Sequence, residues 1–529
     1  MMSTSNASSP LGSPFRSGVA AIAAVAAIAV AVPAAAQAPP GLAAAPPRDA
    51  PPHAAPPQAA PPPAAPPQAA RRLTLDEALR LARDQSEAIT IAQAAEARAD
   101  ADHVRARSQR LPQFSASSSY DRTLASEFSS AIDRSGPVCA PLSVDPAEPL
   151  AARVSELERA AQCGALGPTF DFANLPFGQK NVYRVNVSFS QLVWAGGRVG
   201  ALERQALGSR DAAVLGTSSA EASVALDVTR AFYDAALADQ LVAIAQSGLD
   251  QATAAYDQTR LAFEAGRQPE FELLRAQVAR DNQRPVLIRR QADRDIAYLR
   301  LRQLLDLPPG TPLDLVANLD ADDLAPPEPF AAGLDRAAEV DPDARASVRQ
   351  AAALVQVREA GVDVARAARL PNVSVTSSFG EVGYPSSGVF PSFGDFRTNW
   401  TLGASVQVPV FTGRRLKGDE LAAQSDLAEA QARLQQAREL AELDAATARQ
   451  DLAAAQAVWE ASAGTIEQAA RAYQIAELRF REGLSTQLEL SDSRFSLQQA
   501  QANRAQAARD LQVARARVAL LPNLPAGAR

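Results

Sequence analysis

The segment from Val410 to Leu521 contains no proline, in a chain of 529 residues that carries 38 prolines. Proline removes a backbone donor and clashes with the preceding turn, so a segment of this length without it is typical of uninterrupted helix. Large side chains recur in it every seven residues, with small residues between them, at Leu452, Trp459, Ile466, Tyr473 and Phe480. Such a heptad seam predicts long helices that pack side by side as coiled coils.

The same pattern occurs earlier in the chain, at Val242, Leu249, Tyr256 and Phe263. The letters FEAG at 263–266 align with FREG at 480–483, and a glycine suits the left-handed end of a helix. Two copies of a helical hairpin are therefore expected, with helices at 196–265 and 270–305 in the first and at 414–482 and 486–521 in the second. A helix of about 65 residues is roughly 100 Å long, which is deeper than an ordinary globular core.

The composition argues against an enzyme and against a nucleic-acid-binding protein. The only histidines are His53 and His103, and the only cysteines are Cys139 and Cys163, so a metal site or a catalytic triad has almost no residues to use. The formal charge of −7 is spread along the chain and leaves no basic stripe for nucleic acid. No catalytic residue, cofactor or metal is predicted.

The N-terminal region is expected to lie outside the folded part. Residues 1–36 resemble an export signal peptide, because an apolar run from Val19 to Val32 precedes a small-residue cleavage site. The alternative is a membrane anchor, although the run is shorter than the ~20 residues that span a bilayer. Residues 37–72 are rich in proline and alanine and predict a disordered linker of polyproline type.

Four segments alternate apolar and polar residues, which predicts strands at about 111–122, 182–194, 370–380 and 398–411. Strands of about ten residues with one apolar and one hydroxyl-rich face match those of membrane barrels. Trp194, Trp400 and Phe411 are expected at strand ends, where aromatic girdles lie. A small soluble sandwich beside a coiled coil is the alternative for these strands.

Four strands do not close a barrel, and an open sheet edge is not tolerated in lipid. A homotrimer is therefore expected, because three copies give twelve strands, an even number within the range of outer-membrane barrels. The predicted fold is mainly α with a membrane β-barrel. Long antiparallel coiled-coil helices form an α-barrel, and each protomer adds four strands to the β-barrel.

The division of the chain follows from the repeat. The first repeat is expected over 73–318, an acidic, proline-rich crossover over 319–333, and the second repeat over 334–529. A long insertion between the first two strands, 121–181, holds both cysteines. In an exported chain Cys139 and Cys163 are expected to form a disulfide, with free thiols as the alternative.

These segments resemble the TolC-type outer-membrane factor family, the outer membrane efflux proteins. The resemblance covers residues 73 to about 521 and begins at LTLDEALRLA. Its other motifs occur in both halves, as RLPQFSAS and RLPNVSVT, VSFSQLVWAGGR and ASVQVPVFTGRR, and FEAGRQPEFELLRAQ and FREGLSTQLELSDSR. Each motif alone is loose, but this order occurring twice is specific.

The resemblance implies a trimeric channel in the bacterial outer membrane, with its helical barrel in the periplasm and an equatorial collar near the crossover. It implies a passive exit duct of a tripartite efflux pump or a type I secretion system. The implied partners are outer-membrane lipid, a periplasmic adaptor (membrane fusion protein), and an inner-membrane transporter of resistance-nodulation-division, ABC or major-facilitator type. The hairpin tips offer candidate adaptor contacts at Gly266, Arg267, Gly483 and Leu484. The two glycines also suit a tight helix turn.

The resemblance also implies acidic rings at the closed periplasmic aperture. The corresponding residues here are Glu272, Glu489 and Asp492. Carboxylates around a narrow mouth favour cations, whereas acids in the first turns of a helix also suit its dipole.

Related channels hold the aperture shut with a tyrosine and an arginine near the second tip. Here these positions are Phe480 and Ser485, and the partner position in the first half is Phe271. Arg479 or Arg481 paired with Glu272 is the candidate substitute for the latch.

Two other classes of protein compete with a channel. A structural coiled coil or adhesin of the envelope explains the heptads but not four amphipathic strands at repeat-related positions. A periplasmic adaptor needs a compact β-rich module between its helical arms, and the sequence shows none.

Overall fold

The computed structural model describes residues 71–125, 140, 142–162, 180–317, 319, 324–337, 341–385 and 389–527. The chain divides into two units, Met1–Pro66 and Pro67–Arg529, and every described residue belongs to the second. The predicted signal peptide, most of the predicted linker, and both Cys139 and Cys163 lie outside the described residues.

Helices dominate both repeats. The first repeat contains α1 (Leu75–Gln85), α2 (Glu87–Ser108), α5 (Arg198–Glu264) and α6 (Glu270–Leu304). The second contains α7 (Glu328–Ala337), α8 (Ala346–Ala367), α9 (Arg415–Arg481) and α10 (Gln487–Leu520), and a short helix α4 (Leu150–Gln162) lies in the insertion. With 67 residues each, α5 and α9 are about 100 Å long. Among the described helices, none is both long and apolar enough to cross a membrane.

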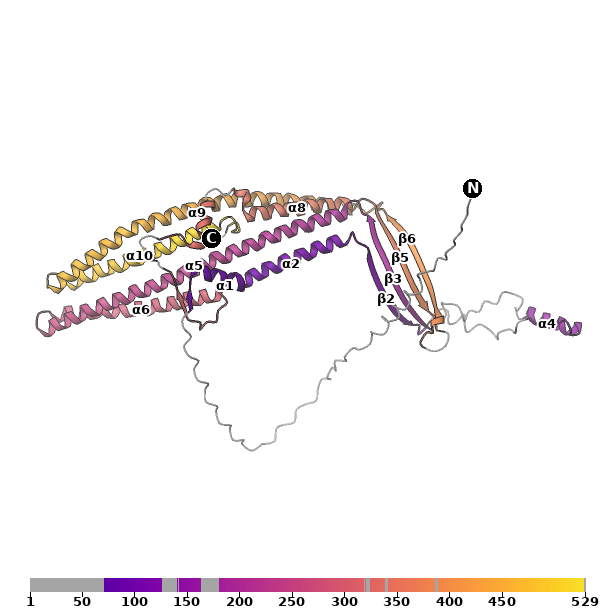
Figure 1. The fold of residues 1–529 in the computed structure, drawn as a ribbon, viewed down its shortest axis with the longest axis horizontal. Helices are drawn as coiled ribbons and strands as arrows, with labels where there is room; N and C mark the ends of the chain where they lie inside the picture. The colour runs from indigo at the N-terminus through magenta and orange to yellow at the C-terminus, as the bar shows by residue number, and fades with distance from the viewer. Residues whose placement is uncertain are drawn as a thin grey trace, which may run out of the picture. The chain divides into compact units, whose positions relative to one another are not determined.

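Four long strands form one antiparallel sheet, as predicted (Figure 1). They are β2 (Gln113–Arg122), β3 (Asn181–Trp194), β5 (Asn372–Gly383) and β6 (Phe396–Gln407), in the order β2-β3-β5-β6. The sheet is open, with β2 and β6 at its edges. A second, two-stranded sheet pairs β1 (Arg71–Leu73) in parallel with β4 (Leu313–Leu315).

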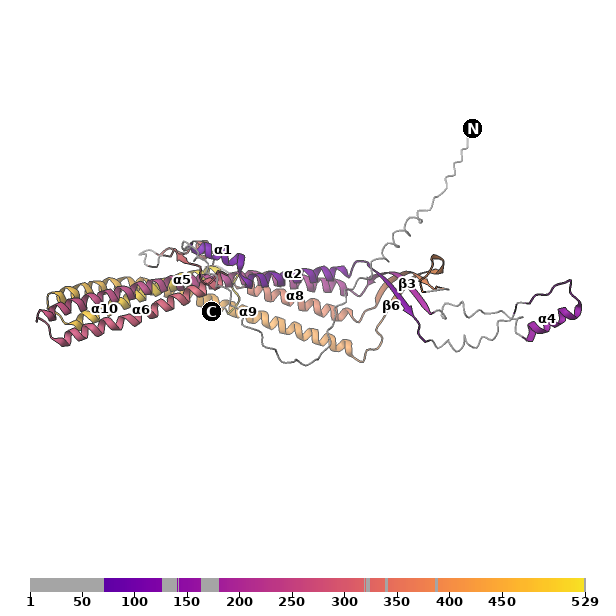
Figure 2. The same ribbon diagram turned by 90° about the horizontal axis from the view of Figure 1, so that it is seen from below.

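The helices pack in two successive layers that share α5 and α9 (Figures 1 and 2). In the layer next to the four strands, α5 contacts both α2 and α8, and α8 contacts α9, which gives the order α2-α5-α8-α9. In the layer that ends at the hairpin tips, α5 contacts both α6 and α10, and α10 contacts α9, which gives the order α6-α5-α10-α9. Each layer therefore has one edge helix from each repeat.

The main hydrophobic core lies where the two layers meet. It joins β1, α1, the middle of α5, the end of α6, β4 and α10, through residues such as Leu73, Phe232, Leu301 and Leu511. The crossover between the repeats contributes buried apolar side chains to the same core, at Leu319, Leu324 and Phe330. This packing anchors the crossover against the middle of the long helices.

Three details of the fold were not predicted from the sequence. Arg71 and Arg72, which were assigned to the linker, belong to β1, which pairs with β4 and buries Leu73 completely. The helical segment before β2 is divided at Ser86, whose backbone is extended, into α1 and α2. Its counterpart in the second repeat is broken between α7 and α8, where Asp341 accepts a hydrogen bond from the N–H of Asp343 beside Pro342.

A buried arginine fixes the C-terminal end of the chain to the second repeat. Arg345, which is 1 % exposed, donates to the carbonyl oxygens of Ala441 at 2.8 Å and Leu521 at 3.2 Å. Its guanidinium lies 3.6 Å from the carboxylate of Asp444, which also accepts the N–H of Gly527 at 2.7 Å. Burial lowers the pKa of Arg345, and Asp444 opposes that shift. These contacts hold the start of α8, the middle of α9 and the C-terminal tail together.

Candidate functional site

The strand register separates the four-stranded sheet into an apolar face and a polar face. Residues on the apolar face align across the strands, with Phe114 opposite Phe189, Val187 opposite Phe379, Phe379 opposite Trp400, and Val375 opposite Ala404. The ring centroids of Phe114 and Phe189 lie 5.1 Å apart, and those of Phe379 and Trp400 lie 6.5 Å apart. The face is mainly apolar, although Ser118, Ser377 and Glu381 also lie on it. An exposed apolar surface of this kind on an open sheet requires lipid or another protein to cover it.

The polar face carries a network of short side chains. Hydroxyl pairs join neighbouring strands, with Oγ–Oγ distances of 2.6 Å between Ser115 and Ser188 and 2.8 Å between Ser374 and Ser405. Ser378 donates to Asn186 at 2.7 Å, and Arg184 forms an ion pair with Asp121. Because hydroxyl, amide and charged groups dominate it, this face suits contact with water.

The aromatic residues lie differently from the predicted girdle. Trp194 ends β3 as expected, but Trp400 lies inside β6 and Phe411 lies beyond its end. Trp400 is the fifth residue of β6, which runs from Phe396 to Gln407 instead of the predicted 398–411, so the prediction that it lies at a strand end is wrong. Trp400 Nε1 donates to Ser377 Oγ at 3.1 Å, which satisfies the indole N–H on an apolar surface.

An aromatic row at the other end of the strands was not predicted. Tyr120 stacks on Tyr183 with ring centroids 4.7 Å apart, and the register continues through Gly383 to Phe396. A Cβ at Gly383 would lie 2.9 Å from the Phe396 ring, so the glycine makes room for it. The signal was present, because both tyrosines lie in register with the alternating apolar positions, but only the pairing of the strands brings them together.

The two hairpin tips have the same backbone structure. Gly266 and Gly483 have φ of +68° and +72°, the left-handed region that favours glycine. Arg267 N–H donates to the Ala262 carbonyl and Leu484 N–H to the Arg479 carbonyl, both at 2.8 Å, in the hydrogen-bond pattern of a Schellman cap. Among the described residues, no atom other than those of the glycine and its chain neighbours lies within 4 Å of a Cβ built on either glycine, so both turns have open space around them.

The predicted aperture carboxylates lie close to these tips. Glu489 and Asp492 are exposed in the first turns of α10, whose N-cap Thr486 accepts the N–H of Glu489. Glu272 is half-buried in the first turn of α6 and lies 3.6 Å from Arg275 of the same helix. Within the described residues of one chain, no group of three or more acidic, histidine or cysteine side chains is arranged to hold a metal.

In the described part of the chain, no hydrogen bond, ion pair or ring contact joins two of the residues considered for the latch. Phe480 is buried against Ala255 and Leu490, and the Ser485 hydroxyl donates to the Ala476 carbonyl at 3.4 Å. Arg479 donates to the Leu484 carbonyl at 3.4 Å. Phe271 is exposed, with the Arg275 guanidinium 4.8 Å from its ring centroid. No ion pair in the described part of the chain joins Arg479 or Arg481 to Glu272, so the expected substitute latch does not form within one protomer.

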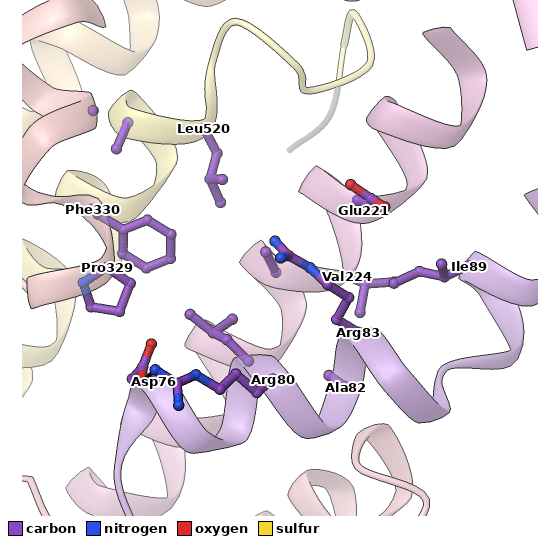
Figure 3. A pocket seen from close by; sticks show the side chains of 14 residues that line it. Asp76, Arg80, Ala82, Arg83, Ile89, Glu221, Val224, Pro329, Phe330 and Leu520 are labelled. Atoms are coloured by element: carbon purple, nitrogen blue, oxygen red, sulfur yellow. Dashed lines mark ion pairs between the residues drawn. The ribbon is translucent and has the colours of Figure 1, made fainter. Parts of the chain in front are cut away.

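A surface pocket of about 320 Å³ lies beside the main core, between α1, α5, α7 and the end of α10 (Figure 3). Arg83 points into it, Phe330 and Leu520 form part of its wall, and Glu221 lies nearby (Figure 3). None of the predicted site residues lines this pocket. It therefore belongs to the middle of the molecule rather than to the sheet or the tips.

Comparison with known proteins identifies the family. The sequence model described as outer membrane efflux protein matches residues 78–306 and 343–523, one match in each repeat. The chain belongs to the outer membrane efflux protein family. It is thus an outer-membrane protein whose helical barrel lies in the periplasm. No curated protein matches the chain.

Solved structures agree with this assignment at the level of the fold. The outer membrane protein VceC of Vibrio cholerae is 17% identical with a TM-score of 0.63, over 85% of this chain and 96% of that one. The CmeC outer membrane channel of Campylobacter jejuni is 15% identical with a TM-score of 0.63, over 86% and 87%. The open state of the MtrE outer membrane channel of Neisseria gonorrhoeae is 17% identical with a TM-score of 0.62, over 85% and 89%.

Proposed function

We propose that the protein is the trimeric exit duct of a tripartite efflux pump or type I secretion system, a passive conduit without enzymatic activity. The observation that carries the proposal is the identity of the free edges. The sheet ends in β2 from the first repeat and β6 from the second. The helical layer next to the four strands ends in α2 and α9. The layer at the hairpin tips ends in α6 and α9, so each layer again has one edge from each repeat. Head-to-tail association therefore closes all three layers at once.

This head-to-tail contact joins two different surfaces, so the interface is heterologous. Such an interface forms a closed ring rather than a filament when the rotations between successive copies add up to a full turn. The sheet must close completely, because a free strand edge is not tolerated in lipid. Three copies give a twelve-stranded barrel, with β6 of one protomer against β2 of the next. In that barrel the apolar face of the sheet meets lipid and the polar face lines the water-filled lumen.

The edge helices carry the apolar surface that such a contact needs. On α6 an exposed row follows heptad spacing through Phe271, Leu274, Val278 and Ile288. On α9 the exposed residues Leu478 and Ile475 lie near the other hairpin tip, at Gly483. Bulky side chains on one edge and small or apolar positions on the other favour knobs-into-holes packing between protomers.

A disulfide between these edges tests the assembly. In a background with Cys139→Ser and Cys163→Ser, the pair Leu274→Cys and Leu478→Cys is expected to yield covalent trimers on oxidation, seen by non-reducing electrophoresis. Within one protomer α5 and α10 separate α6 from α9, so an intrachain bond is excluded. The reduced trimer is expected to conduct ions in planar lipid bilayers.

The matched control pairs Leu478→Cys with Leu299→Cys, at the far end of α6 and about 37 Å from Leu274 by helix rise. This pair is expected to give no covalent trimer. Dimers that do not extend to trimers, or reduced protein that gives no conductance, would refute the exit-duct proposal.

We further propose that Glu272, Glu489 and Asp492 form the acidic mouth of the duct. Glu489→Gln with Asp492→Asn is expected to reduce the preference for cations over anions several-fold, because threefold symmetry multiplies each removed charge. Reversal potentials in asymmetric salt measure this preference. Glu429→Gln with Asp426→Asn, on α9 away from the tips, is the charge-matched control. Equal selectivity in both double variants would contradict the proposed mouth.

The tips are the proposed docking surface for a periplasmic adaptor, through Gly266, Arg267, Gly483 and Leu484. Their support is the exposed, repeat-related cap geometry at both turns. An inner-membrane transporter of resistance-nodulation-division, ABC or major-facilitator type supplies the energy in this proposal. Residues 1–36 direct export, and Cys139 and Cys163 form a disulfide in the loop between β2 and β3.

A further inference from the structure

The packed side of α10 near its hairpin tip alternates polar and apolar side chains. Gln487, Leu490, Arg494 and Leu497 follow heptad spacing, and all four are buried. In the layer at the hairpin tips α10 lies between α5 and α9, so the protein itself encloses these side chains. A polar residue at a packed heptad position lowers the stability of a coiled coil.

Neither polar residue of this seam has a hydrogen-bond partner in the described part of the chain. Gln487 is 1 % exposed, and both its Nε2 and its Oε1 are buried without a partner. Arg494 is 5 % exposed, its Nε is buried without a partner, and no carboxylate of the described residues forms an ion pair with it. Burial lowers the pKa of Arg494, and Tyr473 opposes that shift. Polar atoms that lose water without gaining a partner destabilise the packing that encloses them.

The missing partners of Gln487 do not come from another molecule while the helices stay in this position. Both polar atoms of its side chain are out of contact with solvent within a single protomer. A neighbouring protomer, a water molecule or a ligand therefore reaches them from outside only after α10 has moved away from its neighbours. The unsatisfied groups thus favour a second arrangement, in which α10 has separated from α5 near the tip.

Little apolar packing opposes such a separation at the tip. The buried cluster there consists of Ala255 on α5, Phe480 on α9 and Leu490 on α10, with a few partly buried neighbours. In the middle of the molecule, by contrast, Ala508 and Leu511 fix α10 in the much larger main core. Because stability differs along a structure, α10 is expected to separate first at its tip and to stay fixed at its other end.

The first repeat shows that polar residues at these positions are not unfavourable in themselves. Counted from the tip glycines Gly266 and Gly483, the equivalents of Gln487 and Arg494 on α6 are Glu270 and Gln277. Both of these are exposed, because α6 is an edge helix of its layer. Only the inner position of α10 encloses the polar side chains, so α10 is the helix that is expected to move.

We infer that Gln487 and Arg494 are gating residues, which weaken the packing of α10 against α5 and α9 near the tip and so allow α10 to separate from them. Glu489 and Asp492 lie on the same turns of α10 and are exposed, so this movement displaces the carboxylates of the proposed mouth. The separation of the helices is a property of one protomer. Its effect on conduction rests on the proposed exit duct.

A cysteine at position 255 measures the separation, in the full-length protein with Cys139→Ser and Cys163→Ser. Ala255 is 6 % exposed where α5, α9 and α10 meet, so Ala255→Cys is expected to react with a water-soluble maleimide only while α10 is displaced. Adding Gln487→Met with Arg494→Met is expected to slow this labelling about tenfold, because unbranched apolar side chains suit the enclosed seam.

Two controls separate this effect from a general change in stability. Gln499→Met with Arg449→Met makes the same chemical changes at exposed positions of α10 and α9, and it is expected to leave the labelling of Ala255→Cys unchanged. A second probe, Ala508→Cys in the main core, is expected to stay unreactive in every variant.

Thermal unfolding and conductance in planar lipid bilayers complete the test. Gln487→Met with Arg494→Met is expected to raise the midpoint of unfolding by several degrees and to reduce the time spent in a conducting state about tenfold. Removal of polar groups that only support the fold would instead lower the midpoint, and this result would overturn the inference.

The other outcomes are equally decisive. Unchanged labelling of Ala255→Cys in the Gln487→Met and Arg494→Met double variant would overturn the inference, as would an equal slowing in the exposed control. Slower labelling beside unchanged conductance would overturn the link between this movement and the mouth. If the unaltered protein gave no conductance, the exit duct would be refuted, and the labelling rates would still test the role of Gln487 and Arg494.

Discussion

Replacing Leu402 by arginine is expected to prevent assembly of the protein in the outer membrane. Leu402 lies on the apolar face of the edge strand β6 and is 77 % exposed. An arginine on the lipid face of a membrane barrel costs about 2–4 kcal/mol near the midplane, and the proposed trimer incurs this cost in every protomer. The measurement is the amount of heat-modifiable trimer in the outer-membrane fraction, which should fall close to zero.

The neighbouring residue supplies the control. Thr401 lies on the polar face, where its hydroxyl donates to the Ser378 carbonyl at 3.5 Å. Thr401→Arg is expected to assemble normally, because the guanidinium reaches the lumen, and to lower the conductance for cations. If Thr401→Arg blocked assembly while Leu402→Arg did not, the assignment of the two faces would be reversed.

Arg345→Met is expected to lower the free energy of unfolding by about 3–5 kcal/mol. The substitution removes one partner of a buried charge pair and leaves buried carbonyl groups without a hydrogen-bond donor. The carbonyls of Ala441 and Leu521 and the carboxylate of Asp444 lose their donor. Urea unfolding followed by helical circular dichroism measures the loss. Proteolysis at the C-terminus should also become faster, because the tail is held through Asp444.

Arg438→Ala is the matched control for this effect. Arg438 lies 2.7 Å from Asp343 of the same region, but both side chains are exposed, and a surface pair contributes at most about 1 kcal/mol. The double variant Arg345→Met with Asp444→Leu should recover part of the stability, since it leaves no unpaired buried charge. Equal losses for Arg345→Met and Arg438→Ala would show that Arg345 is not a structural anchor.

The periodic parts of the fold could be predicted because their signals are local. Heptad spacing at Leu452, Trp459 and Tyr473 indicated the packed side of α9, and all three pack against buried clusters. Alternation in β3 and β5 indicated which residues share a face, and the register confirms the four strands. The repeat added the relation between halves, which places α5 and α9 at equivalent positions.

Features that depend on tertiary contacts could not be predicted. The helix predicted at 270–305 forms as α6 with Pro285 inside it, and the packing against α5 that supports it there is not visible in the sequence. Nothing in the sequence near Arg345 shows that three distant carbonyls surround it. Phe480 was considered as a latch residue, yet its heptad position already placed it on the packed side of α9.

The pairing of β3 with β5 has a consequence for how the wall is built. This contact joins the two repeats within one chain, and it joins them in the same sense in which β6 of one protomer and β2 of the next must meet. A ring of chains with one repeat each would have the same order of strand edges. Every contact between neighbouring repeats would then form only by the encounter of two separate chains. Covalent linkage of two repeats removes the translational and rotational entropy cost of every second seam, so duplication halves the number of encounters needed to complete the circle.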